Sequence, residues 1–592
     1  MAKALRTVSQ VTRSTDTAPI EGPLRTALQF FPGLTATLFI LPVLLGLLGT
    51  WLPAFGYLPS IGADSFSLQP WRNLLDNPGI GKALGISLLS SWGAMLLSLL
   101  ISCVLLAGCW QSQLLRWLQR SLPLLLAVPH AAFAIGVVAL LAPGGWLLRL
   151  LSPWATGLAA PPFFSLMNDP NGFGLLLVLT LKELPFVLFM SFIALGQLQV
   201  ERTLYVCRSL GYADTSSWWR VLMPQLLPRL RLPLYAVLAY GLSVVDIALI
   251  AGPNTPPAFA VMLDRMFNHP DITTRLTGSA AATFLLLLTV GSLLLWFFVE
   301  RLYLYWMSRR ASKGHRRDNR FVRSLQVGAG QVTAVTLLII TAGAFVLLLL
   351  WSVSFRWSFP DALPDSYSLR FWQRGWQQLS LPIWYTLATG IASALIGLLL
   401  VVACLEHEVT RRRCSARNTG PRLFWLIYIP LITPQIAFLF GVQTVLLQVN
   451  AWGNLWSLVW IHLVFVIPYL FLSLSGPYRN FDDRYLQQAE ILCGSEWRAL
   501  WRVKWPMLLR PLLAVTALGF AVSVSQYLAT LYIGAGRLPS VTTETVAIAT
   551  GGDRRLIAVF ALFQWLLPLI MYSLALLIPW YIFRHRKAMQ LS

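Results

Sequence analysis

The sequence predicts an all-α polytopic membrane protein with about twelve transmembrane helices in two parallel six-helix repeats. Three observations support this fold class. Of the 592 residues, 57% are hydrophobic and only 11% are charged, whereas a soluble domain carries roughly 25% charged residues. Apolar runs of about 20 residues, long enough to cross roughly 30 Å of hydrocarbon, recur along the whole chain. Several sequence features also occur twice at an almost constant spacing.

The apolar runs predict the spans in order, six in each half of the chain. Each run is rich in Leu, Ile, Val and Phe and is bounded by a polar or Gly/Pro-containing segment. The expected spans are residues 34–51, 84–108, 122–142, 173–195, 234–250, 280–299, 332–350, 385–405, 423–447, 455–474, 512–531 and 556–582.

The positive charges alternate with the loops. The net charge is +22, and most of the 45 Lys and Arg residues fall in every second loop, in both terminal segments and in the connector RRASKGHRRDNR at 309–320. This asymmetry predicts a multi-pass protein of the bacterial inner membrane with both termini and the connector in the cytoplasm. Contact with anionic lipid headgroups explains the basic connector, so membrane lipid is an expected partner and nucleic acid is not.

An internal repeat organises the chain. Three anchors recur at a separation of 282 or 283 residues: Gly211 with Gly494, Pro185 with Pro468, and Pro224 with Pro506. Six spans are an even number, so the second copy enters the membrane in the same orientation as the first, and the repeats are parallel. The expected domains are a first repeat at 1–306 with an N-terminal cytoplasmic tail, a basic linker at 307–328 and a second repeat at 329–592.

A short basic and aromatic passage follows the fourth span of each repeat. The first cassette is GYADTSSWWRVLMP (211–224), and the second cassette is GSEWRALWRVKWP (494–506). In the second, Trp residues and Arg residues recur four apart, which on a helix gives an aromatic stripe beside a basic one. Pro506 is expected to end or redirect this helix. Such a helix suits docking, either to a headgroup layer or to a groove of a partner protein.

The residues before each cassette complete a motif. Gln488-Ala489-Glu490 stands three residues before Gly494, whereas Tyr205-Val206-Cys207 takes that place before Gly211. The two passages resemble the cytoplasmic signature loop of binding-protein-dependent ABC importer permeases, which has Glu-Ala-Ala, three residues, Gly and a Leu-Pro end. Two permease halves in one chain resemble the fused branch of this family that serves ferric iron or thiamine.

The resemblance implies a function. In that family the loop is a coupling helix seated in an ATP-hydrolysing subunit. The chain would then be the permease component of an ABC importer with two ABC ATPase subunits and an external, periplasmic solute-binding protein, moving a thiamine-like cation or ferric iron by alternating access. The coupling residues carried over are Gly211, Trp219, Arg220, Pro224, Gln488, Ala489, Glu490, Gly494, Trp501, Arg502 and Pro506.

No catalytic or metal site is expected in this chain. The segment NPGIGKA (77–83) lacks the first Gly of a phosphate-binding loop and has Ala83 where Ser or Thr would hold Mg²⁺. No Cys or His cluster has metal-ligand spacing, and no nucleophile with a base is visible. The sequence therefore predicts a permease that is not an enzyme and has no cofactor of its own, with ATP and Mg bound by the partner subunits.

Polar residues within the spans are candidates for the translocation pathway. An ionisable group at the centre of a span costs about 2.5 to 3.5 kcal/mol, so each one calls for a functional hypothesis. Asp246 and Gln526 occupy equivalent positions, as SVVD and SVSQ align, and His130 and Gln435 both follow a proline. The alternative is that these groups are satisfied at helix contacts. The six candidates are His130, Lys182, Glu183, Asp246, Gln435 and Gln526.

A second class of transporter fits part of the pattern. An ion-coupled secondary transporter can also be built from parallel six-helix repeats. It would move solute on an ion gradient with no ATPase present, which distinguishes it from an ABC importer. A membrane enzyme or scaffold is a third class, for which the sequence offers no site.

Overall fold

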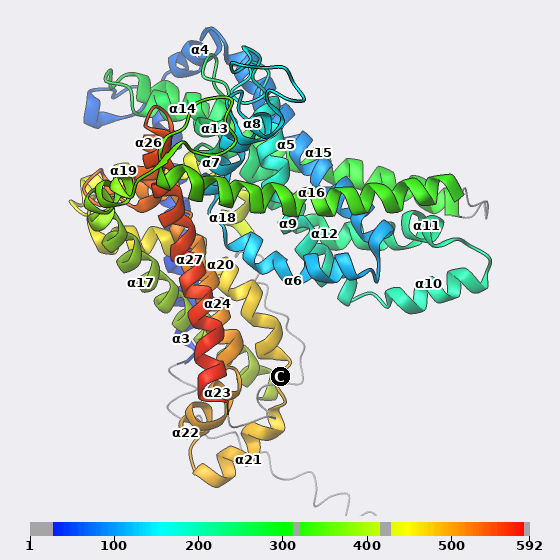
Figure 1. Ribbon diagram of the computed structural model, residues 1–592. Coiled ribbons are helices and arrows are strands. Elements are labelled where there is room, and N and C mark those ends of the chain that lie inside the picture. The colour runs from blue at the N-terminus through cyan, green and yellow to red at the C-terminus, as the bar shows by residue number, and fades with distance from the viewer. Residues whose placement is uncertain (1–27, 312–319, 415–427, 585–592) are drawn as a thin grey trace, which may run out of the picture.

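The computed structural model describes residues 28–311, 320–414 and 428–584. These residues are almost entirely helical (Figure 1), which confirms the all-α class. Two short strands form one antiparallel hairpin, β1 (Ser354–Arg356) with β2 (Ser366–Tyr367). The elements before the connector are α3 (Phe30–Ala54), η1 (Pro59–Ile61), α4 (Gln69–Leu75), α5 (Ile80–Cys109), α6 (Gln113–Ala127), α7 (His130–Leu141), α8 (Trp146–Leu151), α9 (Phe173–Gly196), α10 (Val200–Ser209), α11 (Asp214–Ser217), η2 (Trp218–Leu222), α12 (Met223–Ser243), α13 (Asp246–Ala251), α14 (Phe259–Phe267) and α15 (Thr274–Ala311).

The helices after the connector follow a similar order. They are α16 (Arg320–Val353), α17 (Arg370–Cys414), α18 (Ile429–Ile432), α19 (Gln435–Gln448), α20 (Leu455–Arg479), α21 (Asp483–Cys493), α22 (Glu496–Ala499), η4 (Leu500–Lys504), α23 (Trp505–Met507), α24 (Leu509–Val524), α25 (Tyr527–Gly534), α26 (Val541–Ala549) and α27 (Arg554–Ile582).

The helices are long and apolar enough for a polytopic membrane protein. Within the described ranges, nine helices could each cross a membrane, and a bent pair, Glu496–Met507 with Leu509–Val524, could supply a tenth. The sequence predicts about twelve spans, and in the described residues some of these are not continuous helices. The third, fifth, ninth and eleventh expected spans are each interrupted, and the interruptions fall at corresponding places in the two halves.

Prolines interrupt the third and ninth spans. Val128 and Thr433, each directly before a proline, have extended backbone with ψ of 123° and 126°. Proline disfavours helical backbone at the preceding residue and has no N–H to donate, so one helix ends and another begins after it. As a result α19 has 14 residues, which is about 21 Å and shorter than a bilayer core.

The fifth and eleventh spans break without a proline. Val244, with ψ of 130°, separates α12 from α13, and Gln526, with ψ of 98°, separates α24 from α25. Each break includes only one or two polar residues within a long apolar run, so composition alone predicted a single helix. Asp246 is the first residue of α13.

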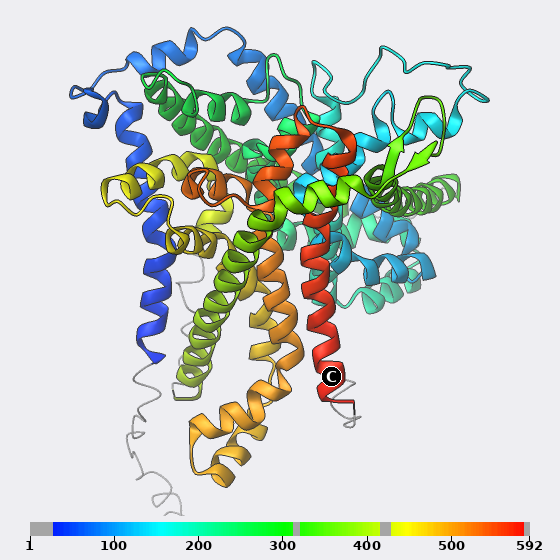
Figure 2. The ribbon, with the colours of Figure 1, turned by 60° about the vertical axis from the view of Figure 1, so that its left-hand side comes forward.

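The first helix of each half packs on the other half. Helix α3 lies along α19, whereas α16 lies along α5 and α7. Small residues permit both crossings: a Cβ added at Gly441 would overlap the carbonyl oxygen of Gly46, and one at Gly136 would lie 2.9 Å from the Cβ of Ala344. Figure 2 shows α3 standing beside the helices of the second half. Close backbone approach through small residues is the usual basis of helix association in membranes.

Matching hydrogen bonds also recur in the two halves. The N–H of Phe259, at the start of α14, donates to Ser87 Oγ of α5 at 2.8 Å. The N–H of Val541, at the start of α26, donates to Thr386 Oγ1 of α17 at 2.9 Å. Each bond satisfies a helix N-terminal donor that has no partner in its own helix. In both halves, a side-chain hydroxyl of a neighbouring helix thus accepts the hydrogen bond from this helix N-terminus.

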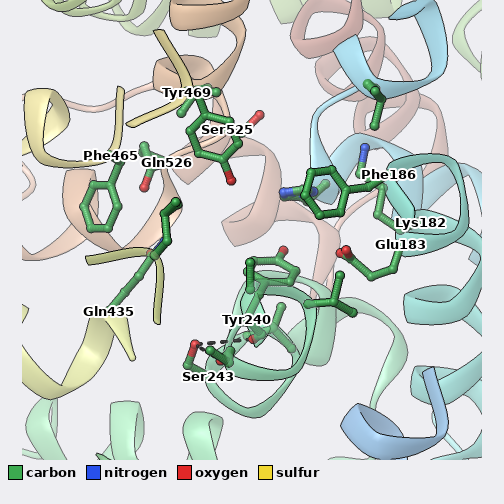
Figure 3. Close-up of a pocket in the computed structure, with 18 of the residues that line it drawn as sticks. Lys182, Glu183, Phe186, Tyr240, Ser243, Gln435, Phe465, Tyr469, Ser525 and Gln526 are labelled. Carbon is green, nitrogen blue, oxygen red and sulfur yellow. Dashed lines mark hydrogen bonds between the residues drawn. The ribbon is translucent and has the colours of Figure 1, made fainter. Parts of the chain in front are cut away.

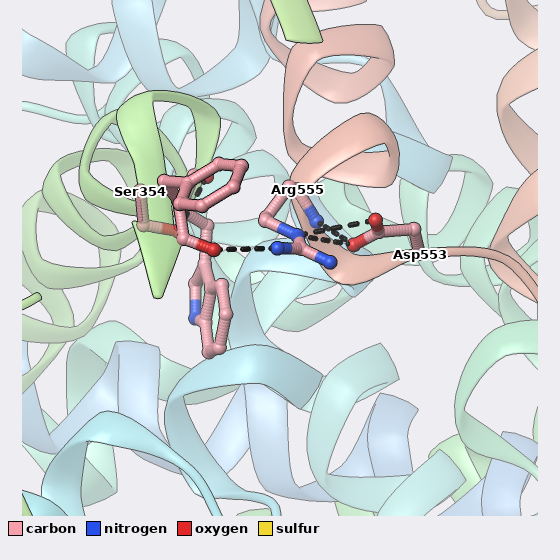
Figure 4. A network of polar contacts seen from close by, with 5 residues as sticks. Ser354, Asp553 and Arg555 are labelled. Carbon is pink, nitrogen blue, oxygen red and sulfur yellow. Dashed lines mark hydrogen bonds and ion pairs between the residues drawn. The ribbon is translucent and has the colours of Figure 1, made fainter. Parts of the chain in front are cut away.

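The region at the connector is partly helical. Helix α15 continues to Ala311 and α16 begins at Arg320, so the expected linker at 307–328 lies largely within helix ends. Its residues 312–319 lie outside the described residues. Beyond the hairpin, Arg555 anchors the start of α27 (Figure 4): its Nη1 donates to the carbonyl of Phe355 at 2.6 Å, and its Nε to Asp553 Oδ1 at 2.8 Å.

The long helices form two diverging groups. Figure 1 shows α15 and α16 running to the right, whereas α17, α24 and α27 run downward, away from a shared region around α7, α13 and α26. The segment α10–α11 lies toward the far end of the first group, and α21–α22 lies at the end of the second. The loops that carry α4, α8 and α14 lie at the opposite end of the molecule. This arrangement places the two cassettes away from those loops.

Candidate functional site

A cavity of about 220 Å³ lies between the two halves (Figure 3). Residues of α7, α9, α12 and α13 line one side, and residues of α18, α20, α24 and α25 line the other. All six residues expected for the translocation pathway contribute to the lining: His130, Lys182, Glu183, Asp246, Gln435 and Gln526. The structure thus brings together residues up to 396 positions apart in the chain, between 130 and 526.

The interrupted helices position these side chains. Helices α7 and α19 begin at His130 and Gln435, directly after the two prolines, and α13 begins at Asp246. Gln526 is the residue before α25. Non-helical backbone at membrane depth is tolerated where it is buried in protein or lines a cavity, because its polar groups then have partners. The four breaks and the cavity therefore belong to one feature of the fold.

Lys182 forms a hydrogen bond with the backbone at the break between α6 and α7. Its Nζ donates a hydrogen bond to the carbonyl oxygen of Val128 at 2.5 Å, and it lies 5.7 Å from the centre of the Phe133 ring. The Val128 carbonyl is at the end of α6, where no following helical N–H is available. The ammonium group thus satisfies a carbonyl that the break exposes, a local partner that the sequence analysis did not assign to it.

Glu183 and Asp246 are the two carboxylates of the lining. Their side chains are only 7% and 6% exposed, and neither forms an ion pair with a residue in the described part of the chain. Figure 3 shows the carboxylate of Glu183 directed toward the space beside the Tyr240 ring. Buried charges without a paired charge are costly. These two buried carboxylates therefore indicate that the cavity has a function.

Three further polar atoms of the lining residues have no hydrogen-bond partner among the described residues. They are His130 Nδ1, the Tyr240 hydroxyl and Gln526 Oε1. The rings of His130 and Tyr240 pack at 4.9 Å. An unsatisfied buried polar group costs about 1 to 3 kcal/mol, so it is expected to find a partner in another state or with a bound molecule. Polar groups in this position are typical of a functional cavity.

Sequence reasoning missed the aromatic part of the lining. Phe186, Tyr240, Phe465, Tyr469 and Tyr527 all line the cavity. Each lies in or beside an apolar run, where an aromatic residue is expected whether it faces lipid, core or cavity. Their only available signal was proximity in sequence to a polar candidate, as for Phe186 near Glu183. Their side-chain direction follows from the tertiary fold alone.

Contacts between the two halves close the cavity on the side that faces the loops carrying α4, α8 and α14. The hydroxyl of Tyr532 in α25 donates to Asp264 Oδ1 in α14 at 2.9 Å. The rings of Phe267 and Phe440 stack at 4.1 Å. Asp264 lies outside the spanning helices, and burial raises the pKa of its carboxyl to about 6. These contacts cross from one half to the other.

The two cassettes have the same sequence of local structures. Gly211 and Gly494 both have positive φ, 82° and 65°, a conformation that glycine adopts without a Cβ penalty. A short helix follows each glycine, α11 or α22, and then a π-helical turn, η2 or η4. Trp219 and Arg220 lie in η2, and Trp501 and Arg502 lie in η4. Two segments of limited sequence identity thus fold alike.

The chain is redirected just after Pro506, as expected, whereas no bend follows Pro224. Pro224 is the second residue of α12, and the chain stays helical through it. Pro506 lies within α23, and the bend of 75° comes after it, at Leu508. Proline is tolerated in the first turn of a helix, where its missing N–H has no helical partner in any case. Pro224 therefore opens a helix, and only the second cassette is redirected.

The helix before the second cassette is held by a small apolar cluster. Ala489 and Leu486 of α21 pack against Ala499 and Leu500. Glu490 is half-buried and Gln488 is exposed. A small residue at 489 allows α21 to approach α22 closely, which gives the Ala of the motif a structural reason. The equivalent Val206 of the first copy is exposed instead.

Both loops expose apolar side chains. Ile491 and Leu492 are 83% and 86% exposed, and Tyr205 before the first cassette is 72% exposed. Trp497, Trp501 and Trp505 form a ring cluster with centroids 4.4 to 5.8 Å apart. Exposed apolar groups gathered at one place mark an interaction surface. Arg502 is exposed beside them.

Comparison with known proteins identifies the family. Residues 415–585 match the model of the binding-protein-dependent transport system inner membrane component. The inner membrane ABC transporter permease protein YnjC of Escherichia coli (strain K12) is 31% identical over 516 residues, which cover 87% of this chain and 91% of that protein. The helical fold with a central polar cavity agrees with these matches, and the chain is a transport permease. It belongs to the binding-protein-dependent ABC transporter permeases.

More distant relatives match a smaller part of the chain. The putative 2-aminoethylphosphonate transport system permease protein PhnV of Salmonella typhimurium is 24% identical over 237 residues, 39% of this chain and 86% of that protein. The spermidine/putrescine transport system permease protein PotC of Escherichia coli (strain K12) is 21% identical over 141 residues, 24% of this chain and 50% of that protein. Family membership decides against the ion-coupled secondary transporter and defines a multi-pass inner-membrane permease.

Proposed function

We propose that this chain forms the whole pore of an ABC importer, with one ABC ATPase subunit on each cassette. An external solute-binding protein delivers a small solute to the side of the permease that has the loops carrying α4, α8 and α14. The cassettes, both termini and the basic connector lie in the cytoplasm, in accord with the distribution of Lys and Arg. ATP and Mg are bound by the ATPase subunits, and this chain supplies the passage and the coupling loops.

The observation that carries this proposal is the repeated structure of the cassettes. Gly211 and Gly494, both with positive φ, each precede a short helix and a π-helical turn. Both loops expose apolar side chains where a partner can bind. Two such surfaces in one chain suit two copies of one ATPase. Arg220 and Arg502 would face acidic groups of those subunits.

The cavity suits a passage of the alternating-access kind. Polar residues from both halves line the cavity. The contact of Asp264 with Tyr532 closes it toward the loops that carry α4, α8 and α14. Movement of the two cassettes toward each other would swing the helix groups that carry them. Such a swing would break the contacts between α14 and α25 and open the passage outward. Ligand-driven change of this type requires different contacts in the two states.

The solute belongs to the same proposal. The family resemblance favours a thiamine-like cation or ferric iron, whereas relatives are named for 2-aminoethylphosphonate and for spermidine and putrescine. Since the named solutes differ, the family does not select one of them. The chemistry of the cavity is the better guide, and it is taken up below.

The test is whether the cassettes bind and stimulate an ATPase. We expect the full chain to co-purify with an ABC ATPase subunit, and the double variant Gly211→Asp with Gly494→Asp to lose both the ATPase and its stimulated hydrolysis while it stays in the membrane. Asp adopts positive φ less readily than Gly, and it adds a negative charge to a docking surface. Stimulated hydrolysis equal to that of the wild type would reject the coupling role.

A matched control is available in this chain. Gly62 also has positive φ, 79°, and an added Cβ there meets no atom within 4 Å, as at Gly494. Gly62 lies next to η1, in the loops at the other end of the molecule. Gly62→Asp should therefore leave ATPase binding unchanged. Loss of the ATPase in this control as well would show that the glycine change acts through general misfolding.

A further inference from the structure

The two carboxylates of the cavity have no cation in direct contact with them. Glu183 and Asp246 are each more than nine-tenths buried, and within the described ranges neither one is ion-paired. They come from different helices, α9 and α13, and reach the same cavity. A buried carboxylate is stabilised by an opposite charge within a few ångströms. The described lining thus holds two carboxylates and only one Lys or Arg, Lys182, so it can accept a second positive group.

Lys182 is not that second group. It is the one Lys or Arg of the described lining, but its Nζ donates to the carbonyl of Val128 at 2.5 Å and lies over the Phe133 ring. Val128 is at the α6–α7 break, so this cation is committed to the backbone there. His130, the other basic residue of the lining, packs its ring against Tyr240 at 4.9 Å. The single charge of Lys182 acts on both carboxylates from a distance, and it does not form an ion pair with either one.

Aromatic residues form much of the remaining wall. Phe186 and Tyr240 belong to the first half with Glu183, and Phe465 and Tyr469 lie across the cavity in the second half (Figure 3). Tyr527 of the second half also lines the cavity. Aromatic faces attract organic cations through the ring quadrupole, by about 2 kcal/mol or more where water is excluded. Hard metal ions need a shell of oxygen ligands instead. Carboxylates combined with aromatic faces thus favour an amine or a quaternary ammonium.

We propose that this cavity is a transit-binding site for a small organic cation, held by Glu183 and Asp246 and enclosed by aromatic side chains. The proposal rests on the proposed function, because it takes the cavity as part of the passage. A volume of about 220 Å³ lies below the roughly 300 to 1,000 Å³ of sites for drug-sized ligands, so the cation is small. The permease then selects for charge in addition to the external binding protein.

Binding of choline to the purified full chain in lipid nanodiscs tests this inference. Choline is a quaternary ammonium, and 3,3-dimethyl-1-butanol is its neutral counterpart of nearly the same shape. We expect calorimetry to show choline binding at least about tenfold more tightly than the neutral compound. Glu183→Gln and Asp246→Asn should each weaken choline binding by about tenfold or more, because each removes one negative charge at nearly constant shape.

Glu544→Gln is the matched control. Glu544 lies in α26, away from the residues that line the cavity, and its change removes the same charge. Choline binding should be unchanged in this variant. All variants are first compared by size-exclusion profile and melting temperature, so that a misfolded protein is not scored. A variant that fails this comparison is replaced by Glu183→Asp, which keeps the charge but shortens the side chain and should weaken binding less than Glu183→Gln.

Several results would overturn the inference. Equal affinity for choline and its neutral counterpart would show an apolar pocket only, and tighter binding of methylphosphonate would show an anion site. Absence of choline binding at millimolar concentration, or binding that both carboxylate variants leave intact, would also reject it. ATPase co-purification is measured on the same preparations. A chain that binds its ATPase but not choline loses the cation site and keeps the permease role, and the converse result rejects the coupling role alone.

Discussion

Lys504 in the second cassette lies with its Nζ 2.5 Å from Glu406 Oε2, and both side chains are buried. The hydroxyl of Tyr478 donates to the same carboxylate oxygen at 2.5 Å. Glu406 belongs to α17 and Tyr478 to α20, so the cassette is tied to two helices of its half. In the first cassette Leu222, two residues before Pro224 as Lys504 is before Pro506, is fully buried instead. The two cassettes are thus anchored by different chemistry.

Loss of one partner of this pair should weaken the second cassette. In Lys504→Met the Glu406 carboxylate stays buried with its charge uncompensated, a change that typically costs about 3 to 5 kcal/mol. We expect a lower melting temperature and less ATPase bound per chain. The double variant Lys504→Met with Glu406→Leu should recover most of the stability, because an apolar pair of similar volume is often as stable as a buried ion pair. A double variant no more stable than the single one would contradict this account.

Asp264 should make the stability of the closed state depend on pH. Burial raises the pKa of Asp264 from its ordinary 3.8 to about 6, so the folded protein holds a proton that the unfolded chain has released between these values. The stabilisation is complete below about pH 3.8 and is lost as the pH rises through about 6. From pH 7 to pH 5 the wild type should gain about 1 kcal/mol over Asp264→Asn, at about 1.4 kcal/mol per pH unit.

Melting temperatures of the two proteins across this pH range provide the measurement. Asn can still accept the hydrogen bond from Tyr532, so the variant isolates the titration from the contact. Tyr532→Phe is the second comparison, because it removes the donor but keeps the ring. Parallel pH profiles for wild type and Asp264→Asn would show that another group is responsible.

The crossing of α3 and α19 should not tolerate a side chain. A Cβ at Gly441 would overlap the carbonyl oxygen of Gly46, and backbone cannot move aside as a flexible side chain can. Gly441→Ala is therefore expected to cost at least about 1 to 3 kcal/mol, the usual range for overpacking. The measurement is the melting temperature of the purified protein. Gly291→Ala in α15, where an added Cβ meets nothing within 4 Å, should leave it nearly unchanged.

Lys182 should be required for the stability of the α6–α7 break. Lys182→Met leaves the Val128 carbonyl without its hydrogen bond and removes the positive charge nearest to the two carboxylates of the cavity. We expect a loss of about 1 to 3 kcal/mol, the cost of an unsatisfied buried acceptor. Lys82→Met, an exposed lysine at the start of α5, is the control for the same change. Equal melting temperatures of the two variants would assign Lys182 no structural role.

The cavity shows how far sequence reasoning reaches. His130 and Gln435 could be paired because each follows a proline, and Asp246 and Gln526 because SVVD aligns with SVSQ. Those local signals predicted that the residues are equivalent. They could not predict that all of them line one cavity, because that depends on how helices far apart in sequence pack. Nor could they separate Lys182, bound to the Val128 carbonyl, from its neighbour Glu183, since adjacent residues point in different directions on a helix.

The sequence by itself determined the all-α membrane class, the duplicated plan and the position of both cassettes, because length, hydropathy and repeat spacing are properties of the chain alone. Only the tertiary structure decided where the fifth and eleventh spans break, which half each first helix packs against, and that Lys504 is paired with Glu406. Each of these depends on a partner distant in sequence, and the free energy of such a contact is absent from any local segment. Hydropathy in particular averages across a break, whereas an unsatisfied backbone carbonyl there is costly until a side chain such as Lys182 reaches it.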